Sequence, residues 1–293
     1  MQKADSQAIV GSAVAVAIAA LIAWAGSQGS MRIEGVPLFA LCALGAFAVQ
    51  WIIFVPSYIA QTEHYFDLTG SLTYLTLVAS VVVLTGASEP RTLLLGALVA
   101  IWAVRLGSFL FVRVKQDGRD DRFDDLKPSF PRFFMTWTLQ GLWVFLTLSA
   151  ALAAMTTANQ APLGLLAWLG LALWIPGFLI EAVADAQKRA FKRDPANAGR
   201  FITTGLWAWS RHPNYFGEIV LWLGVALIAA EVLVGWQWVT MVSPLFVFLL
   251  LTRISGVPML ESKARKKWGQ DAEYLAYKAR TPVLVPRPPR GTD

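Results

Sequence analysis

The chain has 293 residues, of which 56% are hydrophobic and only 15% charged, and its formal net charge is +6. A soluble domain of this size could not cover so much apolar surface with so few charges, so the composition predicts a polytopic membrane protein. The basic residues lie in a few loops beside apolar segments, where membrane orientation explains them, and we expect no nucleic acid partner. The single cysteine, Cys42, excludes an intramolecular disulfide.

Apolar segments recur along the chain, and a membrane-spanning helix needs roughly 20 mainly apolar residues. The sequence predicts eight spanning helices, give or take one, of which the third is short. Their predicted ranges are Ile9–Trp24, Val36–Ile59, Ser71–Leu84, Leu93–Val112, Phe133–Met155, Leu163–Ala184, Tyr215–Val234 and Trp238–Leu251. The predicted fold class is therefore all-α, a polytopic bundle of about 7–8 transmembrane helices in one integral membrane domain over residues 1–293.

Lysine and arginine predict the orientation of the bundle. They are dense after the sixth apolar segment and in the tail, whereas residues 156–162 carry no charge. The positive-inside rule then places the C-terminus in the cytoplasm. No cleavable leader pattern precedes the first apolar segment, so we expect it to be a retained span. Residues 258–280 alternate apolar and basic side chains, which predicts a cytoplasmic interfacial helix, or a pair of short ones, attracted to membrane lipids.

Four charged residues follow one another at helical spacing across the end of the sixth segment: Glu181, Asp185, Arg189 and Lys192. On an α-helix this spacing places them on one face, running from the membrane edge into the cytoplasm. A ladder of salt bridges on a solvated helix end is the alternative interpretation. Because Glu181 still lies within the apolar segment, we favour a polar stripe that holds a ligand with hydroxyl and phosphate groups.

A second group of polar residues lies where a basic loop becomes the seventh apolar segment. Hydrocarbon penalises polar groups at a helix end, so these side chains are expected to face protein or a wet cavity, a solvated helix start being the alternative. Arg105, inside the fourth segment, approaches the same membrane edge. The convergence predicts a pocket, and its excess of cations suits a phosphorylated ligand. The residues are Arg200, Arg211, His212, Asn214, Tyr215 and Glu218.

A third group, Gln61, Glu63 and Tyr65, follows the second apolar segment on the same predicted side. An acid and a phenol are groups that donate protons in catalysis, so these residues are candidate catalytic groups. A merely solvated acidic loop is the alternative. The sequence has only two histidines, which excludes a multi-histidine di-iron or zinc site, and we predict no metal.

From Glu181 onward the chain resembles the C-terminal domain of the steroid 5-alpha-reductase superfamily, especially its bacterial branch, once catalogued as a domain of unknown function. About a third of the chain carries the resemblance, and its Arg-His-Pro-Asn-Tyr core also occurs in the sterol C14-reductases and isoprenylcysteine methyltransferases of that superfamily. The matching residues are Asp185, Arg189 and Lys192, Gly199-Arg200-Phe201, Gly205-Leu206-Trp207, Ser210-Arg211-His212-Pro213-Asn214-Tyr215-Phe216-Gly217-Glu218, Glu261, Trp268-Gly269, Glu273-Tyr274, Tyr277 and Arg280-Thr281-Pro282.

The resemblance implies a multi-pass protein of a bacterial inner membrane that binds NADPH in a cytoplasm-facing cavity. Hydride would pass to the conjugated enone of a lipophilic, steroid-like or isoprenoid-like substrate from the bilayer. Residues 161–293 would form the cofactor half and residues 1–160 the substrate side. The predicted cofactor wall comprises Glu181, Asp185, Arg189, Lys192, Arg200, Trp207, Arg211, His212, Asn214, Tyr215, Glu218 and Arg105, with Glu261 closing it.

The N-terminal half departs from the steroid reductases. Their adjacent Gln-Glu pair is absent, and Trp102 stands before Arg105 where their tyrosine is expected, so the sequence does not identify the substrate. An S-adenosylmethionine-dependent methyltransferase of the isoprenylcysteine type remains a second hypothesis, because it shares the Arg-His-Pro-x-Tyr segment. A non-enzymatic transporter or scaffold is a third, which the absent internal repeat disfavours. The oligomeric state is not indicated.

Overall fold

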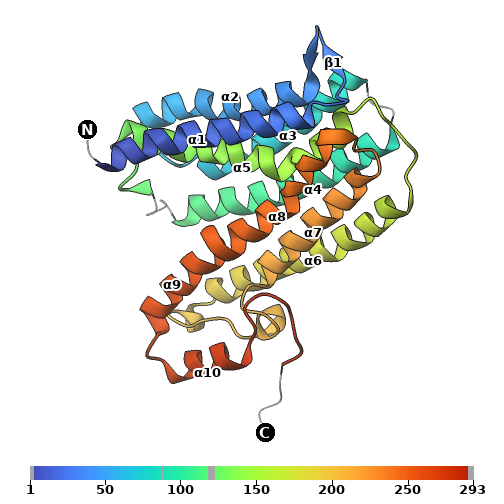
Figure 1. Ribbon diagram of the computed structural model, residues 1–293. Helices are drawn as coiled ribbons and strands as arrows, with labels where there is room; N and C mark the ends of the chain where they lie inside the picture. Colours follow the sequence, from blue (N-terminus) through green and yellow to red (C-terminus); the bar gives the residue numbers. More distant parts are fainter. Residues whose placement is uncertain (1–2, 87–88, 118–122, 290–293) are drawn as a thin grey trace. The chain divides into compact units, whose positions relative to one another are not determined.

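The computed structural model describes residues 3–86, 89–117 and 123–289 (Figure 1). Within these residues, eight helical segments are long and apolar enough to cross a membrane, which confirms the predicted all-α polytopic bundle. In chain order the elements are α1 (Lys3–Gly26), β1 (Arg32–Ile33), β2 (Val36–Pro37), α2 (Leu38–Ile59), α3 (Phe66–Thr85), α4 (Pro90–Asp117), α5 (Phe130–Thr156), α6 (Leu165–Arg193), η2 (Pro195–Asn197), η3 (Gly205–Ala208), α7 (Pro213–Ala230), η4 (Gly235–Met241), α8 (Val242–Leu249), η5 (Leu250–Ile254), α9 (Gly256–Trp268) and α10 (Ala272–Arg280).

The chain between the first two helices forms a small β-hairpin, which the hydrophobic pattern did not predict. Arg32 pairs with Pro37 and Ile33 with Val36 in an antiparallel register. Glu34 and Gly35 at the tip both have positive φ, as a tight turn requires. The second helix therefore begins at Leu38 instead of the predicted Val36.

The third helix is a full span and not the short one predicted from Ser71 to Leu84. It begins at Phe66, because the polar residues before Ser71 continue the helix. The hydroxyl groups of Thr69 and Thr73 donate to the carbonyl groups four residues earlier, at 2.7 Å each. Hydroxyl groups satisfied within the helix do not interrupt it, which is why a polar stretch was misinterpreted as a loop.

The last apolar segment runs from Gly235 to Trp268, well past the predicted end at Leu251. Its 34 residues would extend roughly 50 Å as a helix, whereas a bilayer core is about 30 Å thick. The π-helical turn η5 and Ser255 separate α8 from α9. The tail thus forms α9 and α10, the pair of short helices that was one of the two predicted forms.

Contacts divide the chain into two compact units. Unit 1 comprises Met1–Ala167 and Ala226–Ser243, and unit 2 comprises Trp168–Val225 and Pro244–Asp293. In unit 1, α5 packs against α1, α2, α3 and α4 and forms the centre of the core. Over its apolar stretch, 83% of the residues of α5 are buried. The second half of the helix consists of small and apolar side chains that neighbours contact on every side.

A buried ion pair lies at one end of unit 1. The Arg91 side chain, 1% exposed, donates to the Glu231 carboxylate at 2.8 Å and to the carbonyl groups of Pro162 and Ile228. The same carboxylate accepts from the backbone N–H groups of Gly164 and Leu166 at the start of α6. These hydrogen bonds satisfy amides that a helix start leaves without partners, so the pair joins three segments.

In unit 2, α6 and α7 approach each other closely enough for backbone to meet backbone. A Cβ on Gly217 would lie 2.5 Å from the carbonyl oxygen of Gly177 and 2.6 Å from the amide nitrogen of Glu181. A Cβ on Gly224 would lie 2.5 Å from the carbonyl oxygen of Gly170. The two glycines of each helix lie about two turns apart, so they share one face, and the helices run antiparallel. Only glycine fits at these positions.

We predict that Gly217→Ala lowers the free energy of unfolding by roughly 2 kcal/mol, because a methyl group there overlaps fixed backbone atoms. Thermal unfolding in detergent measures the loss. Gly45→Ala in α2 is the matched control, since its Cβ would meet only a side-chain atom, Leu77 Cδ2, at 3.1 Å and no fixed backbone. Equal unfolding temperatures for the two variants would contradict the close-packing argument.

Candidate functional site

Acidic and amide side chains of α6 and α7 meet just beyond the glycine contact in unit 2. Asn214 Nδ2 donates to Asp185 Oδ1 at 3.2 Å. Asp185 is 7% exposed, and Glu181, one turn earlier on α6, is 2% exposed. The close helix approach therefore places two buried carboxyl groups of α6 beside the first turn of α7.

The predicted stripe lies along a single helix. Glu181, Asp185, Arg189 and Lys192 are all on α6, which continues beyond the predicted end of the span at Ala184 to Arg193. Exposure increases along the stripe, from two buried acids through the half-buried Arg189 to the exposed Lys192. The stripe therefore begins in the protein interior and ends at a solvent-accessible helix end.

Trp207, in the 3-10 turn η3, anchors the following loop to α6. Its indole Nε1 donates to the carbonyl oxygen of Ala184 at 3.0 Å, and Lys188 Nζ lies 4.5 Å from its ring centroid. The phenol of Tyr277 in α10 donates to the Trp207 carbonyl oxygen at 2.7 Å. The indole is 3% exposed, so Trp207 acts here as a packed structural anchor.

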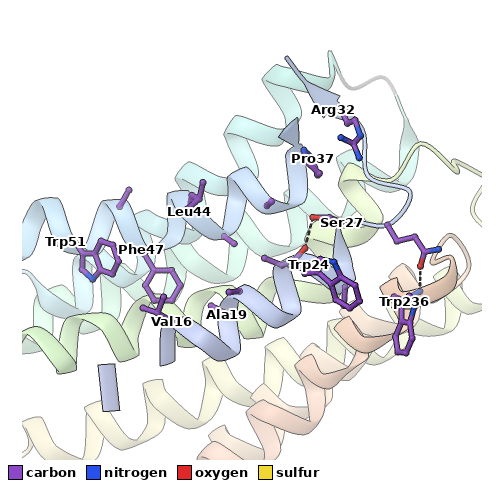
Figure 2. Close-up of a pocket in the computed structure, with 17 residues that line it drawn as sticks. Val16, Ala19, Trp24, Ser27, Arg32, Pro37, Leu44, Phe47, Trp51 and Trp236 are labelled. Atoms are coloured by element: carbon purple, nitrogen blue, oxygen red, sulfur yellow. Dashed lines mark hydrogen bonds between the residues drawn. The ribbon is translucent and has the colours of Figure 1, made fainter. Parts of the chain in front are cut away.

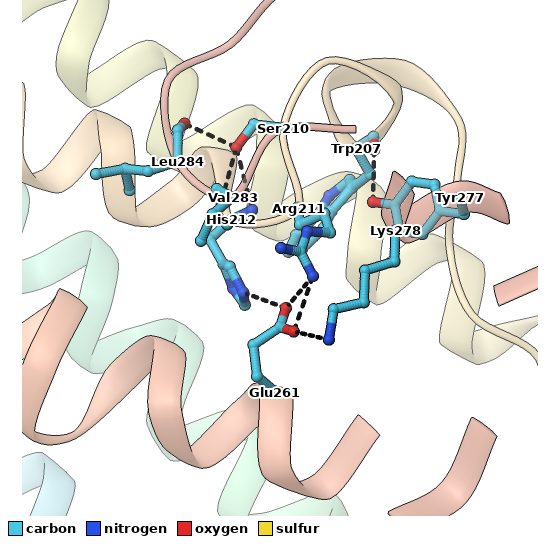
Figure 3. A network of polar contacts seen from close by, with 9 residues as sticks. All are labelled: Trp207, Ser210, Arg211, His212, Glu261, Tyr277, Lys278, Val283 and Leu284. Carbon is cyan, nitrogen blue, oxygen red and sulfur yellow. Dashed lines mark hydrogen bonds and ion pairs between the residues drawn. The ribbon is translucent and has the colours of Figure 1, made fainter. Parts of the chain in front are cut away.

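Three basic side chains contact the Glu261 carboxylate (Figure 3). Arg211 Nη1 donates to both carboxylate oxygens at 2.7 and 2.8 Å, and Lys278 Nζ lies 3.1 Å from Oε2. His212 Nε2 lies 3.3 Å from Oε1. The cluster joins α9, α10 and the loop before α7. Arg211 is nearly buried, so most of its charge is balanced inside the protein.

The segment after α10 runs beside the loop that carries Arg211. The Arg211 backbone N–H donates to the Pro282 carbonyl oxygen, and the Arg287 N–H donates to the Trp209 carbonyl oxygen, both at 2.9 Å. The Ser210 hydroxyl donates to the Leu284 carbonyl oxygen at 2.8 Å and accepts from the His212 N–H at 3.1 Å. We call residues 282–287 the C-terminal strap, because they hold this loop in place.

His212 is buried between an aromatic ring and the cluster. Its ring stacks on that of Tyr215 with centroids 5.6 Å apart and planes at 9°. Burial lowers the pKa of His212 below its usual 6.5, an effect that the hydrogen bond to Glu261 opposes and the nearby cations Lys188 and Arg211 reinforce. We therefore expect the imidazole to be neutral at physiological pH.

Aromatic residues hold the tail helices against the loop that follows α6. The Phe201 ring lies between those of Trp268, Tyr274 and Tyr277, with centroid distances of 5.2–5.8 Å. Trp268 Nε1 also donates to the Gly199 carbonyl oxygen at 2.6 Å. Motif residues that are distant in sequence therefore meet in one packed aromatic cluster, and their role here is structural.

A polar cleft of about 560 Å³ in unit 2 is lined in part by the same loop. Its guanidinium groups come from Arg200 and Arg280, and its hydroxyl groups from Thr203 and Thr204. Further lining residues are Phe191, Asn197, Gly199, Phe201, Asp271, Glu273 and Ala276. Arg200 is exposed, and its backbone position follows Gly199, whose φ of 81° favours glycine. The cleft has the donors that bind phosphate oxygens.

The predicted catalytic group lies in unit 1, at the turn between α2 and α3. Glu63 is 7% exposed, and its Oε2 lies 2.6 Å from Lys127 Nζ, which raises the pKa of Lys127. Tyr65 is 52% exposed. Gln61 has φ of 52° and donates through Nε2 to the Tyr58 carbonyl oxygen at 2.7 Å. The three residues are thus close in sequence. The contacts described above join Glu63 to Lys127 and Gln61 to Tyr58, not to one another.

Two remaining predicted wall residues are partly buried. Glu218 lies on the second turn of α7 in unit 2, and Arg105 lies on α4 in unit 1. Sequence reasoning did not predict the contacts that Lys278, Tyr277 and Ser210 make. No local pattern marks Lys278, which is one of many lysines in the tail, and only its position beside Glu261 distinguishes it.

The fold and these contacts define an all-helical, multi-pass membrane protein with a polar network at one end of its second unit. The chain belongs to the family described as "Protein of unknown function (DUF1295)", whose model matches residues 51–281. The match thus covers α3 to α10 and the whole Glu261 cluster. It begins within α2, so α1 and the β-hairpin lie outside it.

Two curated proteins are similar to the chain. The uncharacterized protein C594.04c of Schizosaccharomyces pombe is 28% identical over 196 residues, which are 56% of this chain and 57% of that protein. The probable O-methyltransferase ustE of Ustilaginoidea virens is 32% identical over 66 residues, which are 22% of this chain and 23% of that protein. The matches thus span little more than half of the first protein and about a quarter of the second. No solved structure matches.

We predict that Glu261→Gln destabilises unit 2 by about 3 kcal/mol, because removing the carboxylate charge leaves the nearly buried Arg211 without its counter-ion. Thermal unfolding of the full chain in detergent measures the effect. Glu273→Gln, which removes an exposed carboxylate from α10, is the control and is expected to leave stability unchanged. A Glu261 variant as stable as this control would contradict the assignment.

We predict that stability falls as pH drops below about 6.5, because of His212. Its folded pKa lies below 6.5, so in this range the unfolded chain binds a proton that the folded chain does not, and protons favour unfolding. Comparing the unfolding temperatures of wild type and His212→Gln at about pH 7.5 and about pH 5.5 isolates this contribution. The variant should lose less stability on acidification than wild type. An equal loss of stability on acidification in wild type and variant would refute the lowered pKa of His212.

Proposed function

We propose that the chain is a membrane-bound NADPH-dependent reductase that transfers hydride to the activated C=C bond of a lipophilic substrate from the bilayer. We also propose that it belongs to the steroid 5-alpha-reductase superfamily, with its C-terminus in the cytoplasm. The observation that carries the proposal is the polar cleft of about 560 Å³ with Arg200 and Arg280 beside two threonines. Planar guanidinium groups bind phosphate through paired hydrogen bonds.

The donor set of unit 2 fits a phosphorylated dinucleotide. Arg200 and Arg280 would hold its phosphate groups, and Thr203 and Thr204 would supply hydroxyl donors. Arg189 and Lys192, at the end of the α6 stripe, would extend this basic surface. Arg211 has a different part in the proposal, because Glu261 already balances its charge. It would hold the loop before α7 in position.

The acidic and amide groups of the network suit the uncharged parts of the cofactor. The carboxylate of Asp185 can accept from ribose hydroxyl groups, and Asn214 is held beside it by their hydrogen bond. When bound, NADPH would supply the hydride. The protein would bind it, orient it and exclude water, which is the usual division of work between an enzyme and its cofactor. Glu181, Tyr215 and Glu218 remain proposed members of this wall.

The reduction also needs a proton donor, and the candidate groups are those at the turn between α2 and α3. Tyr65 is the favoured donor, because its phenol is exposed. The Glu63 carboxylate forms an ion pair with Lys127 at 2.6 Å, so in this proposal it orients other groups and does not donate. Gln61 would donate a hydrogen bond to the substrate carbonyl oxygen through its amide.

A second candidate function is S-adenosylmethionine-dependent methyl transfer. It is favoured by the similarity to the probable O-methyltransferase of Ustilaginoidea virens, which is 32% identical over 66 residues. Adenosylmethionine carries a positive charge, one carboxylate and no phosphate, so it needs fewer cations than NADPH does. The two functions therefore predict different effects of removing Arg200.

We predict that NADPH raises the unfolding temperature of the detergent-purified chain, and that Arg200→Gln and Asn214→Ala each remove most of this shift. Ligand at about 100 times its dissociation constant adds roughly 2.7 kcal/mol of stability, which a thermal shift assay detects. Arg193→Gln is the matched control, because this exposed arginine ends α6 outside the cleft lining. It should respond to NADPH as wild type does.

The same assay with S-adenosylmethionine separates the two candidates. A shift with adenosylmethionine alone, unaffected by Arg200→Gln, would replace the reductase proposal with the methyltransferase. Undiminished NADPH shifts in both the Arg200 and the Asn214 variants would show that the cofactor wall is placed wrongly. No shift with either ligand would overturn both proposals.

A further inference from the structure

An apolar groove of about 860 Å³ runs between α1 and α2 in unit 1 (Figure 2). Alanine is the most frequent residue of its lining, and these small side chains leave space between the larger ones of the two helices. The alanines that line it are Ala19, Ala20, Ala23, Ala25, Ala40, Ala43 and Ala48, joined by Val16, Leu44, Phe47 and Trp51. Its volume is in the range of small-molecule sites.

The length of the groove matches one leaflet of a bilayer. Along α1 it extends from Val16 to Ala25, roughly 14 Å at 1.5 Å per residue, and along α2 from Ala40 to Trp51, roughly 16 Å. Half of a hydrocarbon core of about 30 Å is about 15 Å. A chain lying in the groove would therefore reach from one membrane face to the middle of the bilayer.

One end of the groove has the features of a membrane–water interface. Trp24 and Trp236, both largely exposed, lie there with ring centroids 6.4 Å apart, and tryptophan is enriched at headgroup depth. Gln28 Oε1 accepts from the backbone N–H of Trp236 at 2.6 Å, which joins the turn after α1 to η4. Figure 2 shows Trp24, Trp236 and Arg32 at the same end, with Trp51 at the other.

Arg32 supplies a positive charge at that end. It is an exposed residue of β1 that lines the groove, and its Nη1 donates to the Gly35 carbonyl oxygen at 2.7 Å. This hydrogen bond uses one of the five N–H donors of the guanidinium and holds the side chain on the hairpin. A guanidinium at the mouth of an apolar groove complements a lipid that joins a hydrocarbon chain to a phosphate.

We propose that this groove is a binding site for an anionic phospholipid, with one acyl chain between α1 and α2 and the phosphate at Arg32. The site is independent of the proposed reductase function, since all its residues belong to unit 1. It differs from ordinary lipid contact in its preference for a negative headgroup. An exposed apolar helix face alone would take zwitterionic and anionic lipids equally.

The experiment measures binding of phosphatidylglycerol and phosphatidylcholine, matched in chain length, to the delipidated full chain by native mass spectrometry. Wild type should prefer phosphatidylglycerol about fivefold, the factor expected for one basic residue at an anionic membrane surface. Arg32→Gln should lose this preference, whereas Arg32→Lys should keep most of it. Lys3→Gln removes one exposed cation from the far end of α1 and should behave as wild type.

Filling the groove tests the acyl-chain part of the proposal. Ala20→Trp places a large side chain in the groove from an exposed position and should weaken binding of both lipids. Ala17→Trp, an equally exposed position on α1 outside the groove lining, is the matched control and should bind as wild type. Retained preference in Arg32→Gln, or equal lipid binding by the two tryptophan variants, would overturn the proposal.

Discussion

The close approach of α6 and α7 is the constraint on which the polar network of unit 2 depends. Gly217 and Gly224 bring the backbone of α7 against that of α6, and no residue with a Cβ fits at either contact. In a bilayer, helices associate mainly through such close packing, because lipid offers little hydrophobic driving force between them. Gly217 directly precedes Glu218, and a Cβ on Gly217 would lie 2.6 Å from the amide nitrogen of Glu181, so the packing that joins the helices also sets the position of the acids.

The Arg-His-Pro-Asn-Tyr segment contains residues with two different structural roles. Arg211 and His212 face the Glu261 carboxylate and hold the tail helices to the loop, whereas Asn214 faces Asp185 on α6. Two exposed arginines, Arg200 and Arg280, line the polar cleft instead. A count of cations in the sequence treats all of these as available to a ligand, but a buried ion pair is already balanced. Under the proposed function, binding of a phosphorylated cofactor would therefore depend on fewer arginines than the sequence contains.

The sequence predicted the helices well, because roughly 20 apolar residues in a row have few alternatives in a membrane. It also placed Asp185 and Asn214 near one another from helical spacing and the position of the membrane edge. It misplaced the start of α3, where Thr69 and Thr73 satisfy their hydroxyl groups within the helix. It missed the β-hairpin, and it did not predict that Lys278, among many basic tail residues, would pair with Glu261. Both features depend on contacts between segments that no local pattern encodes.

The C-terminal strap has a consequence for biosynthesis. Residues 282–287 hydrogen-bond to the backbone at Trp209 and Arg211, so the loop before α7 reaches its final form only after residue 287 has left the ribosome. All eight apolar segments are synthesised earlier and can enter the bilayer without it. Insertion thus does not depend on completion of the polar network, and a chain truncated before residue 282 would keep the apolar segments but lack the strap that closes the network.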